Sequence, residues 1–457
     1  MKRLFVFILL ISVGNIWAES QILETYVETG LANNLALQQK TFSLKQSAAA
    51  LNEARGMFLP SVTLDTRYSR ADGGRMIDLP IGDLMNPVYQ SLNSLLQQDV
   101  FPSIKNQQIA FLREEEHDTK VRVIQPLFQP AVIYNHRIKS DLRDMAREER
   151  NSYKRQLISE IKTAYFNHLK TVRLVDLLDE TEGLLRENVR VANSLFKNDK
   201  VTKAEVYRAE AELHGFHKQQ AEAEKGKILS ASYFNFLLNR PLDSAIEIDT
   251  TIQILAFQSQ NLEEGIERAL QKREELTILK EVVSLSGHNI RLNQTSFLPG
   301  ITAVFDYGYQ GEKYRFDKQD DYWMASLIAS WNVFNGFQDK FKVDQAKFAK
   351  KERESQFAEV NKQIELQVTD AYHSLLVAED SKLAAESEER SANKSFEMIA
   401  RMYKEGIAPQ ISYMDARNAK TRAEVGAVNA LYDLLIKQAE WEKSTAAIPL
   451  SAQGEGQ

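Results

Sequence analysis

The side chains that could do chemistry are few and scattered. His214 and His217 lie three residues apart, as two metal ligands on one helical face would, but no third ligand can be placed with them. The acidic stretch 114–118 could hold a divalent cation, although a solvated loop is the better interpretation. No nucleophile elbow, phosphate-binding glycine loop or metal-ligand spacing is present in the sequence. We therefore expect neither an enzyme nor a cofactor or metal site.

The N-terminus indicates export. Lys2 and Arg3 precede an apolar run at 4–13, and a small residue, Ala18, follows. This is the layout of a secretory signal peptide over residues 1–18, with cleavage expected after Ala18. The 457-residue chain has a formal net charge of −6 and no cysteine. An acidic exported chain argues against a nucleic-acid partner, and the lack of cysteine excludes disulfides.

The sequence predicts unusually long helices, and any functional site must be positioned by them. Between Ile161 and Phe196, apolar residues recur about every 3.5 residues, the period of helices that wind around neighbours. The sequence predicts a helix at 134–198, which would be about 95 Å long, and a second one at 337–404. Return helices are expected at 201–236 and 410–445. No ordinary globular core is that deep.

Shorter segments before each long helix alternate in polarity. At 61–70, Val62, Leu64 and Tyr68 share one face, while Thr63, Asp65 and Arg67 share the other. A tilted strand of a membrane barrel has this pattern, as does a strand in a soluble sandwich. Because no segment after residue 18 reaches 18 apolar residues, any membrane would be crossed by strands. Further strands are expected at 120–128, 301–310 and 323–333, helices at 22–56 and 262–295, and an irregular connection at 71–119.

The same order of elements occurs twice. Phe58-Leu59-Pro60 recurs as Phe297-Leu298-Pro299, at the entrance to each strand pair. The chain is therefore predicted to contain two repeats of helix–strand–strand–long helix. The first covers 19–250, with a membrane hairpin at 58–132, and the second covers 251–457, with a membrane hairpin at 297–334.

Four membrane strands cannot stand alone. An open sheet in lipid leaves N–H and C=O groups unpaired along its edges, each costing several kcal/mol, and known membrane barrels begin at about eight strands. Two copies would supply eight strands and three would supply twelve. The physics thus predicts an oligomer without choosing the number.

The two helix–helix turns, FKNDKVTKAEVYRAE at 196–210 and YKEGIAPQISYMDA at 403–416, resemble those of TolC-type outer-membrane efflux proteins. The likeness extends over essentially all of the chain after residue 18. It implies a mainly α fold with a β-barrel: a homotrimer with a 12-stranded barrel in the lipid of the outer membrane, continued by a 12-helix periplasmic tunnel. It also implies an exit duct for efflux or type I secretion, docked onto a periplasmic adaptor (membrane fusion) protein and an inner-membrane pump of RND, ABC or MFS type.

The resemblance also implies roles for particular residues. Gly406 falls on the turn glycine of the family, Asp415 on an acidic position at the periplasmic mouth, Glu205 on its counterpart in the first turn, and Tyr403 on a tyrosine that helps to hold the mouth shut in some members. The implied adaptor-contacting turns contain Asp199, Lys200, Val201, Gly406, Ile407 and Ala408. Asp199 departs from the usual glycine, but aspartate tolerates positive φ better than most residues.

These residues suggest an electrostatic iris. Rings of Asp415 and Glu205 would favour cations where the helices taper, whereas the plainer alternative is that both are solvated surface acids. Asp65, Arg67 and Asp306 are expected to line the barrel lumen, with or without a selective role. Two other classes of protein compete with the duct. A periplasmic coiled-coil adaptor or scaffold would have no pore, and a passive porin would lack rods of this length.

Overall fold

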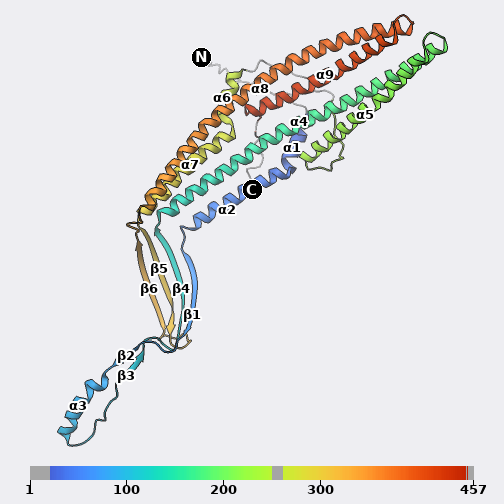
Figure 1. Cartoon of the computed structure of the whole chain (residues 1–457). Coiled ribbons are helices and arrows are strands. Elements are labelled where there is room, and N and C mark those ends of the chain that lie inside the picture. The colour runs from blue at the N-terminus through green and yellow to red at the C-terminus, as the bar shows by residue number, and fades with distance from the viewer. Residues whose placement is uncertain (1–20, 250–260, 449, 451–457) are drawn as a thin grey trace, which may run out of the picture. The chain divides into compact units, whose positions relative to one another are not determined.

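The computed structural model describes residues 21–249, 261–448 and 450. The expected signal peptide at 1–18 lies outside these residues. The chain divides into two compact units. One is helical and contains described residues of 1–48, 141–285 and 349–457, and the other contains all the strands within 49–140 and 286–348. Figure 1 labels the elements of both units.

Two helical hairpins make up most of the helical unit. α4 (Pro130–Lys197) and α5 (Lys203–Leu237) form one hairpin, and α8 (Gln338–Lys404) and α9 (Gln410–Ser444) form the other (Figure 1). Their bounds agree with the expected ranges to within four residues. The largest difference is the start of α4 at Pro130, because a proline suits the first helical turn, where its missing N–H would be unpaired anyway.

The helical unit contains two large hydrophobic cores, one mainly from each repeat, and Leu435 of α9 also joins the first. Most of the α4 stripe is buried or partly buried as its period predicted, although its last residue, Phe196, is exposed. Ile161, Tyr165 and Leu169 pack with Leu23 and Phe234. The second core joins residues of α8 and α9 to the preceding helices through Ala269, Leu276, Ile364, Val368, Leu375, Leu434 and Trp441. Burial of each large apolar side chain stabilises the fold by about 1.5–3 kcal/mol, so these two cores hold the long hairpins to the shorter helices.

The helices before each strand pair are broken, contrary to the expectation of one helix at 22–56 and one at 262–295. The observed pairs are α1 (Gln21–Asn33) with α2 (Leu35–Gly56), and α6 (Leu262–Lys272) with α7 (Glu274–Gln294). At the first break, the buried Asn34 donates from Nδ2 to the Leu237 carbonyl (2.9 Å) and accepts the Leu37 N–H at Oδ1 (3.0 Å). A side chain that bonds to backbone groups in this way competes with the helix ladder, and periodicity does not report it.

The second break, at Arg273, lies at the equivalent point of the second repeat. There the Arg273 backbone is extended, with ψ of 128°. The next residue, Glu274, accepts hydrogen bonds from the Arg155 guanidinium of α4 at 2.7–3.2 Å, and both side chains are buried. Both repeats therefore interrupt the short helix where a buried polar contact reaches it.

The strand unit contains a four-stranded antiparallel sheet in the order β1-β4-β5-β6. β1 (Ser61–Arg70) and β5 (Gly300–Gly311) lie where expected. β4 (Glu115–Phe128) begins five residues before 120, and β6 (Asp321–Ser330) ends before 333, which corrects both expected strands. Pro126 lies inside β4, next to a register shift. A bulge tolerates proline because the ladder hydrogen bond is already lost there.

The connection expected to be irregular at 71–119 contains ordered structure. β2 (Met76–Leu79) pairs with β3 (Gln107–Ala110), and α3 (Ile81–Leu96) lies between them. The helix was not expected because the segment contains prolines. Pro80 immediately precedes α3 and Pro87 lies within it, at the seventh helical residue. Residues 115–119 also form part of β4, so the acidic stretch 114–118 lies mainly in a strand and not in a loop.

No described helix is both long enough and apolar enough to span a membrane. In this single chain, the described sheet has two open edges, β1 and β6.

Candidate functional site

Both long hairpins turn through the same backbone motif. At the end of α4, the Lys200 N–H donates to the Leu195 carbonyl (2.9 Å) and the Asp199 N–H to the Phe196 carbonyl (3.0 Å). At the end of α8, the Ile407 and Gly406 N–H groups donate to Met402 and Tyr403 in the same way (2.8 and 3.0 Å). This pattern is a Schellman motif, which needs positive φ at its C′ residue.

The two C′ residues are Asp199, with φ of 55°, and Gly406, with φ of 77°. The expectation that aspartate would sustain the first turn is therefore confirmed. The neighbouring turn residues Lys200 and Ile407 are exposed, and 65% of Ile407 is accessible. Both turns thus present side chains outward, as a surface that contacts a partner requires.

The predicted gate residues lie close to the second turn but in different surroundings. Asp415 is exposed on α9, and Glu205 is partly buried in the first turn of α5. Tyr403 is 2% exposed and stacks on Tyr413, with ring centroids 4.8 Å apart. Its hydroxyl makes no hydrogen bond within the described chain. Burial, together with the Glu205 charge, raises the pKa of Tyr403 to about 12.

Two polar contacts that sequence reasoning missed connect the hairpins behind the turns. Gln410 of α9 donates from Nε2 to the Glu205 carbonyl of α5 (3.0 Å), and the buried Arg417 pairs with Glu212. Within each helix, the two partners are seven residues apart. The available signal was this heptad spacing of polar residues at positions that face a neighbouring helix. These contacts tie the first hairpin to the second near the tips.

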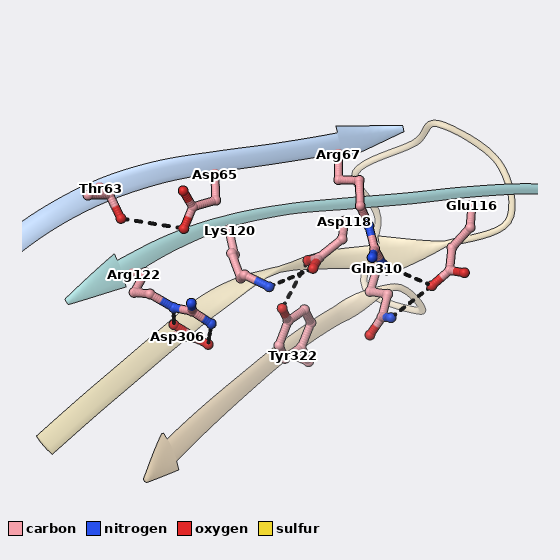
Figure 2. Close-up of polar contacts among 10 residues, drawn as sticks. All are labelled: Thr63, Asp65, Arg67, Glu116, Asp118, Lys120, Arg122, Asp306, Gln310 and Tyr322. Atoms are coloured by element: carbon pink, nitrogen blue, oxygen red, sulfur yellow. Dashed lines mark hydrogen bonds and ion pairs between the residues drawn. The ribbon is translucent and has the colours of Figure 1, made fainter. Parts of the chain in front are cut away.

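The second predicted site is one face of the sheet, which Figure 2 shows. The register places Asp65 of β1 opposite Lys120 of β4, and Arg122 of β4 opposite Asp306 of β5. Arg122 donates two hydrogen bonds to the Asp306 carboxylate, both 2.8 Å long. The Asp306 side chain is fully buried. Arg67 of β1 lies 3.7 Å from Glu116. Asp65, Arg67 and Asp306 therefore share one face, as the alternation predicted.

This face is polar but largely self-neutralised. Asp118 accepts hydrogen bonds from Lys120 (2.6 Å) and from the Tyr322 hydroxyl (3.0 Å), and Gln310 donates to Glu116 (3.1 Å) (Figure 2). Pairs of this kind leave little net charge for selecting an ion. The opposite face carries exposed apolar side chains, including Leu64, Trp323 and Leu327 at 69–71% exposure. A sheet with these two faces separates an aqueous side from an apolar side.

The histidine pair at positions 214 and 217 lies outside both sites. His214 and His217 are exposed on α5, and His217 Nε2 lies 3.4 Å from Glu182. Within the described residues, no three potential metal ligands come together. Their interpretation as surface residues stands.

Comparisons with known proteins agree with this geometry. The family model described as "Outer membrane efflux protein" matches residues 265–446. No curated protein matches the sequence significantly. Among solved structures, the outer membrane channel CmeC of Campylobacter jejuni is 16% identical, with a TM-score of 0.77 over 93% of this chain and 85% of that one. VceC of Vibrio cholerae is 14% identical, with a TM-score of 0.74 over 93% and 95% of the respective chains.

A third structure, the open state of the MtrE outer membrane channel of Neisseria gonorrhoeae, is 14% identical with a TM-score of 0.75 over 93% of this chain and 88% of that one. The fold is thus that of an outer-membrane channel. The family match in the second repeat confirms the resemblance to TolC-type outer-membrane efflux proteins. Both findings agree with the resemblance from which the expectation of an outer-membrane exit duct comes.

Proposed function

We propose that three copies of this chain assemble into the outer-membrane duct of a tripartite efflux or type I secretion system. The observation that carries the proposal is the four-stranded sheet with one polar face, one apolar face and open edges at β1 and β6. In lipid those edges must be paired, and pairing β1 of one copy with β6 of the next satisfies both. Three copies give a closed barrel of twelve strands, within the size range of membrane barrels.

The polar face then lines the lumen. The paired charges Arg122–Asp306 and Lys120–Asp118 keep that wall wetted without a strong preference for either sign of ion. The duct itself holds no source of energy, so an inner-membrane pump drives transport, and a periplasmic adaptor joins the pump to the helix tips. The exposed turns at Asp199–Val201 and Gly406–Ala408 are the surfaces proposed for that adaptor.

The periplasmic mouth is the proposed gate. Three copies of Asp415 and three of Glu205 would form acidic rings at the tips, which repel anions and hold cations. The contacts of Gln410 with Glu205 and of Arg417 with Glu212 fix the two hairpins of one protomer to each other. Opening then requires the tips to separate between protomers or these contacts to break within one protomer, and adaptor docking would bias that equilibrium.

The assembly is tested on the full-length protein expressed with its leader. We expect an outer-membrane, heat-modifiable trimer in detergent that gives discrete single-channel currents in planar bilayers. A monomeric, water-soluble protein without conductance would contradict the proposal and would favour the scaffold alternative.

The gate is tested separately by Asp415→Asn in the same trimer. Removal of three charges should weaken the preference for cations and the block by divalent ions, and the nearby Asn418→Asp tests whether any added acid has an effect. Asn418 is exposed on the same helix, one turn further from the tip. Unchanged selectivity and block in Asp415→Asn would remove this residue from the gate and leave the duct itself intact.

A further inference from the structure

Helix α3, in the long connection between β1 and β4, is held on one face by the chain that returns beside it. Asn86 makes two hydrogen bonds with the backbone of Ile104, and Asn93 makes two with the backbone of Phe101, all at 2.9 Å. A Cβ at Gly82 would collide with the Ile104 carbonyl, so glycine permits this close approach. At 100° per residue, Gly82, Asn86 and Asn93 fall on one face, which we call the asparagine face.

A second face of α3 is apolar and exposed. Leu84, Val88, Leu92 and Leu95 fall within a stripe roughly 120° wide that also includes Ile81, Met85 and Leu96. A stripe of this width is typical of a helix that packs against a core. Yet Leu84 is 69% exposed and Leu95 is 81% exposed. The asparagine face fixes the helix to its own connection and leaves this apolar stripe available for another partner.

The charge of the helix argues against a membrane surface as that partner. Helices that lie on lipid carry lysine and arginine on their polar face, which attract anionic headgroups. α3 contains one charged residue, Asp83, and no basic residue. The apolar spacing through 81, 84, 88, 92 and 95 also follows the steps of three and four that allow equivalent helices to pack together.

The place of α3 in the fold brings equivalent helices together. The connection leaves the sheet at Arg70 of β1 and returns at Glu115 of β4, at the ends of these strands remote from α2 and α4 in sequence. β1 is an open edge that the proposed assembly pairs with a neighbouring copy. A twelve-stranded barrel has a radius of about 12 Å. Three helices packed 8–10 Å apart lie roughly 5–6 Å from its axis, which is within reach of a connection rooted in the wall.

From these observations, we propose that the apolar stripe of α3 is a contact surface for the α3 helices of the other copies of this chain. Packed through Leu84, Val88, Leu92 and Leu95, the three helices close over the outer end of the barrel. This closure rests on the proposed trimer, and it adds a constriction formed by the β1–β4 connection, distinct from the gate proposed at the helix tips.

Disulfide trapping tests the contact, because the chain has no cysteine of its own. Val88→Cys and Leu95→Cys place a thiol in the stripe, whereas Gln90→Cys and Ser94→Cys place one on the polar face of the same helix. Upon mild oxidation of the trimer, we expect the stripe variants to form disulfide-linked dimers about tenfold faster than their polar partners. Equal rates for both pairs, or no cross-link in any variant, would overturn the proposal.

Conductance and lipid contact provide independent readouts. Val88→Asp would place three carboxylates together, and their repulsion should part the helices and raise single-channel conductance, whereas Gln90→Asp should leave it unchanged. A bimane label attached to the introduced thiol of the Leu95→Cys variant should escape quenching by brominated phospholipid in proteoliposomes. Strong quenching would assign the stripe to the membrane surface and overturn the proposal. A conducting trimer without the expected cross-links refutes only the α3 contact, whereas loss of trimer and conductance in the unmodified chain refutes the proposed function.

Discussion

The tip of the α8–α9 hairpin is built on aromatic rings, whereas the equivalent tip of α4–α5 is built on small side chains. Phe396, Tyr403, Tyr413 and Ala416 form a cluster that Leu184, Val191 and Leu195 of α4 also cover. The residues 207 positions earlier are Val189, Phe196, Val206 and Ala209. Of these, Val206 and Ala209 are buried with Ala192, while Phe196 is 38% exposed against 2% for Tyr403.

The same turn therefore rests on two cores of different strength. The second hairpin has a well-filled tip that its own protomer completes, and the first has a thinner one whose aromatic ring remains partly open. If a neighbouring copy in the proposed trimer covers that ring, the first tip depends on assembly and the second does not, and the two tips contribute unequally to the gate.

The largest expected effect compares the two aromatic positions. Tyr403→Ala should lower the opening free energy of the second tip by about 4 kcal/mol, because it leaves a cavity at a fully buried site. Phe196→Ala should cost the first tip about 1 kcal/mol, because its ring is already partly exposed. Hydrogen exchange of the tip amides in the purified trimer measures both. Equal losses at the two positions would break the comparison and would show that a neighbour buries Phe196 as fully as Tyr403.

The next effect concerns the ion pair that joins the tips. Arg417→Ala should destabilise the paired tips by about 3 kcal/mol, because it leaves the largely buried Glu212 carboxylate without its ion-pair partner. The measured signs would be faster exchange at both turns and a higher closed-state leak current. Lys437→Ala is the matched control on α9, since its pair with Glu440 lies within one helix and is half-exposed. A similar response to both substitutions would show that the pair with Glu212 does not fasten the hairpins.

Much of this comparison was accessible from the sequence. The duplication, the long helices and the positive φ of Asp199 follow from periodicity and turn chemistry, because these signals are local and occur twice. The aromatic stack of Tyr403 on Tyr413 does not, since the two rings meet across a turn whose packing depends on α4. The breaks at Asn34 and Arg273 were missed for a related reason: each depends on a buried polar contact with a helix distant in sequence.

For the sheet too, some features could be predicted from the sequence and others could not. Alternation placed Asp65, Arg67 and Asp306 on one face, but the bidentate pair of Asp306 with Arg122 depends on strand register, which a single strand does not specify. Helix α3 was not predicted, because prolines near and within a segment usually indicate that it is not helical. In the structure, hydrogen bonds from Asn86 and Asn93 hold this helix to the returning chain.

A third prediction uses pH to separate the tips. The pKa of Tyr403 is about 12 when folded and near 10 when unfolded, so folding favours the neutral phenol. Its contribution is fully present below pH 10 and is lost as pH rises through 12, by roughly 1.4 kcal/mol at pH 11. The second tip should therefore loosen between pH 9 and 11 more than the first, which has Phe196 at the equivalent position. Tyr403→Phe should reduce this difference, because phenylalanine cannot ionise and the Tyr403 hydroxyl makes no hydrogen bond that the substitution would remove. The stacked Tyr413, whose pKa burial also raises, accounts for what remains. An undiminished difference in that variant would assign the loosening to other groups.

The smallest expected effect comes from exchanging the residue types at the two C′ positions. Asp199 holds positive φ at a cost that glycine avoids, so Asp199→Gly should stabilise the first turn by up to about 1 kcal/mol, offset in part by the greater freedom of glycine in the unfolded chain. Gly406→Asp should weaken the second turn by a similar amount, with φ of 77° imposed on a residue that has a Cβ. Exchange rates of the turn amides report both changes, and Lys200→Gly, one residue beyond C′, controls for added flexibility alone. Opposite signs for the two C′ substitutions would show that the turns share one backbone requirement. Two losses would mean that the Asp199 side chain makes a contribution of its own, and the tips would then differ in their turns as well as in their cores.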